Sequence, residues 1–449
     1  MKFFVYRLFY FIYGIQRKLS KQVTVSGMVV LLLLNAAALT GDSSQSMNYQ
    51  IFSFLLSLLL ISLVYSLLFR YRFIATRRLP RLATVGIKLK YRIVINNKSN
   101  KLQKGLKLFE NFADYRPTFS EFIETSATRK AQRNYFNQSL GYYRWLWLIS
   151  LKQCGKVQPI NLPPLAAHSK TEVICEIIPT HRGVIRLTGM TVARPDPFGF
   201  FNACTTIYLP QSLLILPKLY QLPLIQLPGA KGYQSGNLAL ASSVGDSEEF
   251  RSLRDYRSGD SLRKIHWKSW AKIGKPVVKE EQDEFFLRHA LILDTFQSVN
   301  YSEILEEAVS IAASLACEVQ TQDSLLDLIF VGNEAYSFTF DRGLSHTDRI
   351  LEILASVVAC RDKAFDSIIP GVIEKISLLS GCICIFLCWD EDRKRLVNYL
   401  NSMGIHTLVL IITEQEDQLE NFDSNSINDQ HTTFHILKLG KIQEGLMHI

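Results

Sequence analysis

The chain has 449 residues, a formal net charge of +9 and an apolar content of 48%. Its length predicts two or three domains, and its apolar content exceeds what a soluble globule of this size needs. The eight cysteines give no metal-ligand signal, and in a cytoplasmic body we expect them to be reduced. Composition therefore disfavours a purely soluble protein and a fold held by disulfides.

The surplus of apolar residues lies at the front of the chain. Residues 22–41 and 49–69 carry no charge, and Asp42 is the only charged residue between Lys21 and Arg70. Each stretch is long enough to cross ~30 Å of hydrocarbon at ~1.5 Å per helical residue. We therefore expect residues 1–79 to be an N-terminal segment with a two-helix transmembrane hairpin.

Basic residues flank this hairpin on both sides. Five basic residues and no acid precede the first stretch, and twelve basic residues without an acid lie from Arg70 to Lys107. Such flanks stay on the cytoplasmic side, so both termini and the soluble body are predicted to be cytoplasmic. A signal-peptidase site at 36–38 is the alternative, which the long preceding segment and the immediate second stretch disfavour.

The basic block after Arg70 also bears on partners. It directly follows a membrane exit and has no groove-reading helix, which disfavours nucleic acid. Anionic lipid headgroups attract a basic segment by ~1 kcal/mol per well-placed Lys or Arg. The sequence therefore predicts membrane lipid, and not nucleic acid, as a partner.

Residues 80–227 are predicted to form a small β-sandwich. Twelve of the fourteen prolines lie from Pro80 to Pro228, which favours short strands and turns over long helices. Alternation of apolar and basic residues predicts a strand over 85–95, and further strands are expected at 172–178, 184–192 and 205–209. The aromatic stretch 142–147 is interpreted as another strand packed on the core, with a partner surface as the alternative.

Residues 228–285 are predicted to be a linker, 228–245, followed by a highly charged region. Nine acidic and nine basic residues lie between Asp246 and Glu284, together with several large apolar side chains. We expect many of these charges to lie against apolar surface and to pair as an Arg/Asp network. A turn at 258–261 is predicted to cap a helix that ends at Gly274, and the region is expected to join two domains.

Residues 286–449 alternate between strands and helices. This alternation predicts a doubly wound α/β domain with an antiparallel edge strand at 335–340 and a closing strand at 434–439. The other expected strands are 290–293, 325–331, 382–387 and 407–412, and the expected helices are 302–320, 348–360, 370–379 and 392–403.

One motif carries a family resemblance. The order EF-x-x-LR-x-Y-x-x-GD-x-x-R-x-IHWK, followed by K-x-VVKE and an LILDT strand, resembles the domain of unknown function 58 family of bacterial membrane proteins. An RG pair at 182–183 and a DPFG run at 196–199 also resemble that family, whereas Trp270 stands where it usually has a small hydroxyl residue. The matching positions proposed as the interaction signature are Phe250, Arg254, Tyr256, Gly259, Asp260, Arg263, His266, Trp267 and Glu280.

The resemblance implies a von Willebrand A-like C-terminal domain, a place in the bacterial inner membrane and an association with MoxR-type AAA ATPases. In von Willebrand A domains, an Asp-x-Ser-x-Ser loop, a Thr and an Asp hold Mg²⁺. The positions that could correspond here are Asp294, Ser298, Thr347 and Asp390. They also lie where an open α/β sheet has its ligand crevice.

Phe296 replaces the first Ser of that loop and cannot bind a metal ion. Thr347 and the acidic residues also suit ordinary helix capping. We therefore expect a degenerate, metal-free crevice and no cofactor, with Mg²⁺ as the alternative.

A catalytic role for His266 is the other possibility weighed, because His is the usual general base near neutral pH. The sequence has no Gly-x-Ser-x-Gly elbow, Walker A loop or dinucleotide fingerprint. A structural His266 bonded to Asp260 or to a backbone carbonyl is favoured.

The sequence thus predicts an α+β multidomain membrane protein that acts by binding, as an adaptor or scaffold without catalytic residues. The alternative is a metal-dependent hydrolase or nuclease that uses Asp294, His266 and Asp390.

Overall fold

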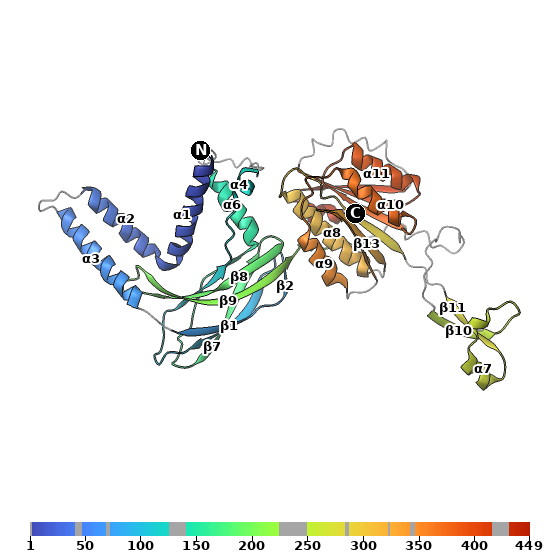
Figure 1. The fold of residues 1–449 in the computed structure, drawn as a ribbon, viewed down its shortest axis with the longest axis horizontal. Coiled ribbons are helices and arrows are strands. Elements are labelled where there is room, and N and C mark those ends of the chain that lie inside the picture. Colours follow the sequence, from blue (N-terminus) through green and yellow to red (C-terminus); the bar gives the residue numbers. More distant parts are fainter. Residues whose placement is uncertain are drawn as a thin grey trace. The chain divides into compact units, whose positions relative to one another are not determined.

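The computed structural model describes residues 2–40, 47–68, 72–124, 141–223, 249–282, 287–321, 324–341, 346–414 and 431–449. The chain divides into two compact units (Figure 1). Unit 1 comprises Met1–Lys218 and Glu352–Ser356, and unit 2 comprises Leu219–Leu351 and Val357–Ile449. The predicted linker, 228–245, lies outside the described residues.

Unit 1 begins with three helices: α1 (Lys2–Gln22), α2 (Val25–Thr40) and α3 (Met47–Leu68). The sequence predicts only a basic flank before residue 22, whereas the structure has a full helix there. Among the described residues, Met47–Leu67 is the one helix long and apolar enough to cross a membrane, and Val25–Leu39 is apolar but shorter. The first predicted span, 22–41, is therefore longer than the helix found there. Helix α1 extends to Gln22, and α2 begins only at Val25.

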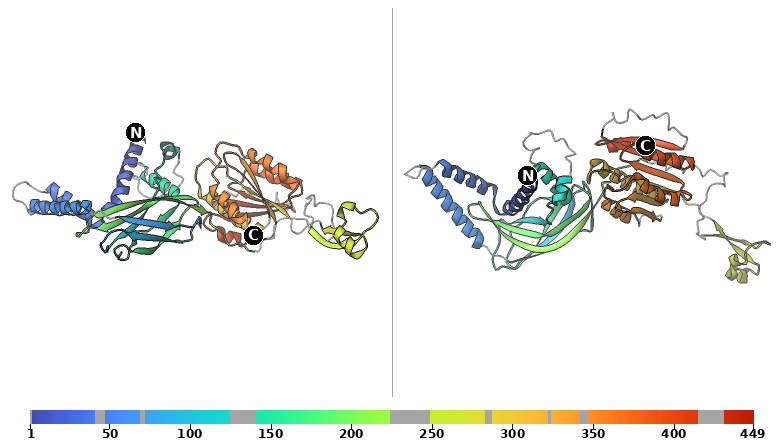
Figure 2. Two further views of the ribbon diagram at one scale, coloured as in Figure 1. Left: turned by 60° about the horizontal axis from the view of Figure 1, so that its bottom comes forward. Right: turned by 45° about the horizontal axis from the view of Figure 1, so that its top comes forward.

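Two sheets form the body of unit 1, and Figure 2 shows them as two curved layers. One has the strand order β1-β3-β7-β5, and the other has the order β2-β9-β8-β4-β6. A single core of aliphatic side chains from both sheets lies between the layers. The bounds are β1 Phe73–Arg78, β2 Leu82–Thr84, β3 Leu89–Asn97, β4 Lys107–Phe112, β5 Gly155–Val157, β6 Ile160–Asn161, β7 Lys170–Pro179, β8 Gly183–Pro195 and β9 Asn202–Leu216.

Two predictions for this sandwich need correction. The strand expected from residue 85 begins only at Leu89, because Gly86 adopts a φ of +81° that makes a turn. The aromatic stretch 142–147 is wrong as a strand: it starts helix α6 (Tyr142–Gln153), which buries Trp145, Leu148 and Ile149. These three residues are spaced by three and four positions, which is a helical period.

A buried ion pair connects the two sheets. Arg77 of β1 donates to Glu110 of β4 through Nη2, at 2.6 Å, and through Nε, at 3.1 Å, with both side chains almost wholly buried. Nη2 of Arg77 also reaches the carbonyl of Gly189 at 3.2 Å, and the Tyr91 hydroxyl donates to Glu110 at 2.8 Å. Burial first, and then the Glu110 charge, raise the pKa of Tyr91, so this hydroxyl stays protonated.

The turn between β8 and β9 holds the junction of α1 and α2. It contains the DPFG run: Asp196 accepts from the Phe200 amide at 2.8 Å, and Gly199 has a φ of +73°. The Thr24 amide donates to the Phe200 carbonyl at 3.1 Å. A Cβ placed on Gly27 would lie 2.2 Å from that carbonyl oxygen, so only glycine permits this approach.

Unit 2 contains a six-stranded sheet with the order β14-β13-β12-β15-β16-β17, in which β14 alone is antiparallel. Helix α8 packs on one face, whereas α10 and α11 pack on the other. The chain leaves β12 toward β13 and later returns to β15 on the other side of β12. Strand order therefore reverses between the carboxyl ends of β12 and β15.

The elements of unit 2 follow the predicted alternation closely. Their bounds are β12 Arg288–Leu293, α8 Glu303–Thr321, β13 Leu325–Val331, β14 Ala335–Phe340, α9 Thr347–Ser356, η4 Phe365–Ile368, α10 Ile369–Ile376, β15 Gly381–Phe386, α11 Glu391–Ser402, β16 His406–Thr413, β17 Thr432–Lys438 and α12 Ile442–Leu446. A mixed α/β protein with several sheets is confirmed.

We expect Gly27→Ala to loosen the contact between α2 and the β8–β9 turn, because the new methyl group meets a backbone carbonyl that cannot move aside. Hydrogen exchange of the 196–201 segment in the full chain should become faster. Gly14→Ala is the control, since its Cβ would meet only the end of the Arg116 side chain, at 3.3 Å, and no backbone atom. Equal exchange in both variants would contradict the expected contact.

Candidate functional site

The signature residues form a small hairpin. Strand β10 (Glu249–Asp255) pairs antiparallel with β11 (Val277–Gln282), and the connection contains a 3₁₀ turn, η2 (Leu262–Lys264), and helix α7 (Trp267–Ile273). The sequence predicts one helix from the 258–261 turn onward, but the structure delays it to Trp267. Gly274 ends α7 with a φ of +75°, as expected of a C-terminal glycine.

Arg254 and Asp260 make the predicted Arg/Asp pair. Two parallel hydrogen bonds join them, from Nη1 to Oδ2 at 2.7 Å and from Nη2 to Oδ1 at 2.8 Å. The Arg257 amide adds a third donor at 2.8 Å. The Arg254 hydrogen bond, followed by that of Arg257, lowers the pKa of Asp260 to about 2. The pair is partly exposed rather than buried, so it fixes the turn at Gly259 more than it stabilises a core.

His266 has a structural position. Its carbonyl accepts from the amides of Ser269 and Trp270, and its Nδ1 lies 2.6 Å from the Ser269 hydroxyl. The sequence analysis expected the His266 ring to bond Asp260 or a backbone carbonyl. That expectation is wrong, because the ring bonds the hydroxyl of Ser269, three residues later in the chain. His266 thus begins α7 and fixes the direction of the helix.

The large apolar side chains of the hairpin divide into a buried set and an exposed set. Ile265, Val277 and Val278 are buried, but Trp267 is 63% exposed and stacks on Trp270 with ring centroids 5.1 Å apart. The short hairpin has only one small buried face, so the residues on α7 and η2 face outward. The other exposed side chains around this pair are Leu262, Arg263, Lys268, Lys272 and Ile273.

The remaining signature residues occupy the two strands and the turn. Tyr256 is half-buried and its amide donates to the Pro276 carbonyl at 3.0 Å. Phe250 pairs in register with Glu281, and Ser252 with Glu280. The side chains of Phe250 and Glu280 lie outside the described residues, and the joining of two domains by this region stays a prediction.

The crevice of unit 2 contains an ion pair that the sequence analysis missed. Asp294, fully buried after β12, accepts from Arg393 Nη2 at 2.9 Å and from Arg393 Nε at 3.0 Å. The amides of Phe296, at 3.0 Å, and Leu387, at 3.1 Å, complete its shell. Burial raises the pKa of the Asp294 carboxyl, whereas the guanidinium and amides oppose this rise. Because arginine does not deprotonate and four donor groups converge here, the pair is ionised at neutral pH.

Further contacts hold Arg393 in this position. Its Nη1 donates to Asp390, which also caps α11 by accepting from the Arg393 amide at 3.1 Å. The guanidinium carbon lies 4.4 Å from the centre of the Phe365 ring, and Phe296 packs edge-on against Phe365. Two carboxylates and an aromatic face thus surround one cation.

These residues do not fit a Mg²⁺ ion. The Arg393 guanidinium bonds both carboxylates that were expected to coordinate the metal, Asp294 and Asp390. Ser298 is exposed, and Thr347 begins α9 with a buried hydroxyl that has no hydrogen-bond partner among the described residues. Within that described part of the chain, no group of three His, Cys, Asp or Glu residues could hold a metal ion.

The sequence carries a local signal for the Arg393–Asp390 contact, whereas the pairing with Asp294 needs the sheet topology as well. It follows Asp390 by three residues, which is the spacing of a capping residue and the first turn of its helix. An arginine at that position, close to the carboxyl ends of two buried strands, can reach the carboxylate that follows the neighbouring strand.

The geometry defines a mixed α/β protein with a charged hairpin before a six-stranded sheet. A family model described as "Protein of unknown function DUF58" matches residues 252–368, from the hairpin to η4. The predicted resemblance is therefore confirmed for this segment, which matches the DUF58 family model. No curated protein matches the chain.

Solved structures give only distant similarity. A CARDB domain from Pyrococcus furiosus, solved with di-metal ions, is 10% identical with a TM-score of 0.18, and the match covers 33% of this chain and 91% of that one. A Salmonella alpha-2-macroglobulin mutant has the same identity and TM-score, and the match covers 32% of this chain and 7% of that one. Neither value supports an argument about fold or function.

We expect Arg393→Met to destabilise unit 2 by ~3–5 kcal/mol, because it leaves the buried Asp294 carboxylate without its partner. Hydrogen exchange of β12 and β15 in the full chain should become faster. The matched control is Asp294→Asn combined with Arg393→Met, which removes both charges and should recover most of the loss. If the single variant exchanges like the parent, the pair does not stabilise the crevice.

Proposed function

We propose that this protein is a membrane-anchored, non-enzymatic adaptor or scaffold that holds a MoxR-type AAA ATPase at the bacterial inner membrane, for protein maturation or envelope-related assembly. The observation that carries the proposal is the exposed Trp267, stacked on the half-buried Trp270, on the hairpin of the family segment. Trp and Arg are enriched among the residues that dominate binding energy, and basic side chains surround this pair.

The C-terminal sheet supports a von Willebrand A-like interpretation of unit 2, because its strand order reverses beside Asp294. The Arg393 guanidinium then replaces the metal ion of such domains. A partner would bind this domain through polar and aromatic surface and not through a carboxylate on Mg²⁺. The hydrolase or nuclease alternative would need Asp294 and Asp390 as free ligands, and both are bonded to Arg393.

Packing within unit 1 supports a two-helix membrane hairpin. Helix α1 precedes α2 and α3 in the chain, and the sandwich follows them, yet α1 packs on α4 (Phe119–Glu124), α6 and β9. The chain must therefore return to the side from which it left. Two crossings, by α2 and α3, satisfy this condition, and one crossing does not.

The first test concerns the partner. The full chain solubilised in detergent, with and without ATP, should retain a MoxR-type ATPase, identified by mass spectrometry of the bound proteins. We expect Trp267→Ala to lower this retention at least tenfold, since an exposed aromatic anchor can contribute 2 kcal/mol or more, roughly, to binding. Met403→Ala is the control, because Met403 is a similarly exposed apolar residue of unit 2. If both variants retain the ATPase equally, the hairpin is not part of the binding interface.

The second test concerns topology. A reporter fused after Ile449 should be cytoplasmic, and one inserted at Ser44 should be external, because basic flanks stay inside. An external carboxyl terminus would contradict both the hairpin and the cytoplasmic ATPase partner. A cytoplasmic signal at Ser44 would show that α2 and α3 do not cross the membrane.

A further inference from the structure

Helix α1 has two apolar faces. One packs into unit 1: Tyr6 and Phe9 make ring contacts with Trp145 and Phe122. The opposite face is uncovered, with Phe4 72% and Phe11 65% exposed. Further exposed apolar residues on that side are Leu8, Ile12, Ile15 and Leu19. At about 100° per residue, these six positions fall within one stripe of the helix.

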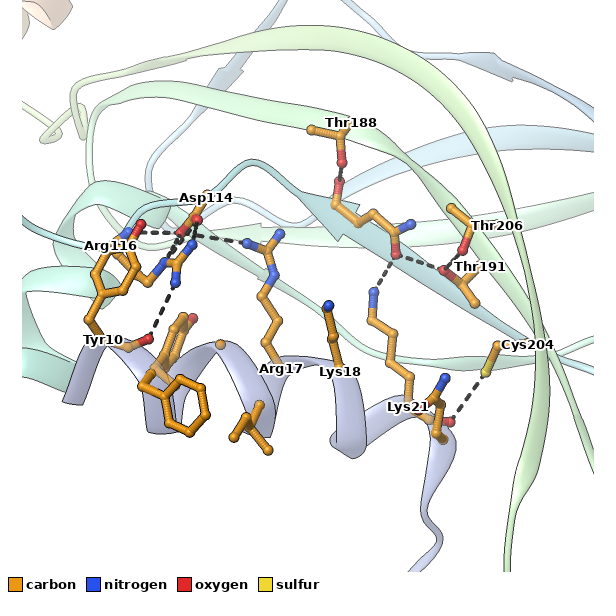
Figure 3. Close-up of a pocket in the computed structure, with 16 residues that line it drawn as sticks. Tyr10, Arg17, Lys18, Lys21, Asp114, Arg116, Thr188, Thr191, Cys204 and Thr206 are labelled. Carbon is orange, nitrogen blue, oxygen red and sulfur yellow. Dashed lines mark hydrogen bonds and ion pairs between the residues drawn. The ribbon is translucent and has the colours of Figure 1, made fainter. Parts of the chain in front are cut away.

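A basic strip lies between these two faces. At the same rotation per residue, Arg17, Lys18 and Lys21 fall to one side of the outer apolar stripe. Figure 3 shows their side chains rising from α1 toward the sheet that contains Thr188, Thr191 and Thr206. An apolar stripe bordered by cations is the pattern of a helix that lies in a membrane interface.

The strip borders a cavity between α1 and the β4–β8–β9 part of the sandwich, with a volume of about 630 Å³. Its walls combine cations, neutral hydrogen-bonding groups and part of the outer apolar stripe, through Phe11 and Ile15. Its charged lining residues are Arg17, Lys18, Lys21, Asp114 and Arg116, and its polar ones include Gln22, Asn111, Thr188, Thr191 and Thr206.

Positive charge exceeds negative charge among the lining residues. Asp114 is their only acid, and it already forms a two-bond pair with Arg116. Arg17 lies 3.8 Å from the same carboxylate, and Lys21 donates to the Asn111 side chain. Lys18 has no ion-pair partner among the described residues. Burial, and then the Arg17 charge, lower the pKa of Lys21, whereas Cys204 and Glu110 oppose this change.

We propose that this cavity binds the phosphate of an anionic phospholipid headgroup, with the acyl chains lying along Phe11 and Ile15 on the outer face of α1. Lys18, Arg17 and Lys21 supply the charge for the phosphate oxygens. A free phosphate would use the same cations, but it would leave the apolar part of the wall without a partner.

The position of α1 favours the lipid. Helix α2 begins three residues after α1 ends, and Thr24 and Gly27 fix the junction against Phe200. The proposal rests on the proposed crossing of the membrane by α2 and α3. If those helices cross, the carboxyl end of α1, with Lys18 and Lys21, is held at the headgroup level.

The test uses the full chain in detergent, with bound lipid measured by native mass spectrometry. Phosphatidylglycerol should bind at least tenfold more tightly than phosphatidylcholine. Lys18→Gln should weaken phosphatidylglycerol binding about fivefold, since a cation near an anionic lipid surface contributes ~1 kcal/mol, and Lys18→Glu should weaken it more. Lys156→Gln, which removes an equally exposed lysine of the same unit, should change nothing.

Glycerol 3-phosphate and inorganic phosphate at millimolar concentration should not displace the lipid. Equal affinity for the two lipids, unchanged binding in both Lys18 variants, or displacement by free phosphate would overturn the proposal. Membrane fractionation of the parent keeps the two proposals apart. A chain that resists alkaline extraction but shows no lipid preference refutes the headgroup site alone, whereas a chain that is extracted refutes the membrane anchoring.

Discussion

The buried ion pair between Arg77 and Glu110 is the interaction on which unit 1 depends. It joins strand β1 of one sheet to β4 of the other, and Arg77 also bonds a carbonyl of β8. A buried charge is stable only with an oppositely charged partner and hydrogen bonds. If one sheet slid past the other, the pair would break and leave a buried charge without its partner, which is strongly destabilising. The sheet that contains β1 is thereby fixed relative to the sheet that holds both the β8–β9 turn and the strand against which α1 packs.

Unit 2 uses a guanidinium in a related way, with a different consequence. Arg393 fills the point where strand order reverses, which is the usual place for a ligand in such sheets. The place where a ligand would enter is thus filled by the buried side chains of Asp294 and Arg393. If the protein acts by binding, as proposed, a partner would contact outward-facing residues such as Trp267 of the hairpin, and the cation in the crevice would support the loops around it.

Periodicity predicted the C-terminal sheet well, because buried parallel strands are continuous apolar runs between amphipathic helices. It failed for 142–147, where two tyrosines and two tryptophans suggest a strand until Leu148 and Ile149 are included at helical spacing. Residues 2–22 were missed as a helix because their basic residues also fit a membrane flank. The Asp294–Arg393 pair could not be predicted from local pattern, since 99 residues separate its members and only the sheet topology brings them together.

The Thr24 hydroxyl donates a hydrogen bond to the Phe200 carbonyl, and this contact, here called the clamp, joins residues 176 positions apart. During synthesis, α2 and α3 leave the ribosome long before β8 and β9 exist, so the proposed insertion of these helices into a membrane would precede closure of the clamp. Once the sandwich has folded, the turn around Gly199 receives a helix junction that is already in place. Folding of the sandwich would then fix the orientation that α2 and α3 had taken in the membrane. These helices could reverse their orientation only if unit 1 unfolded.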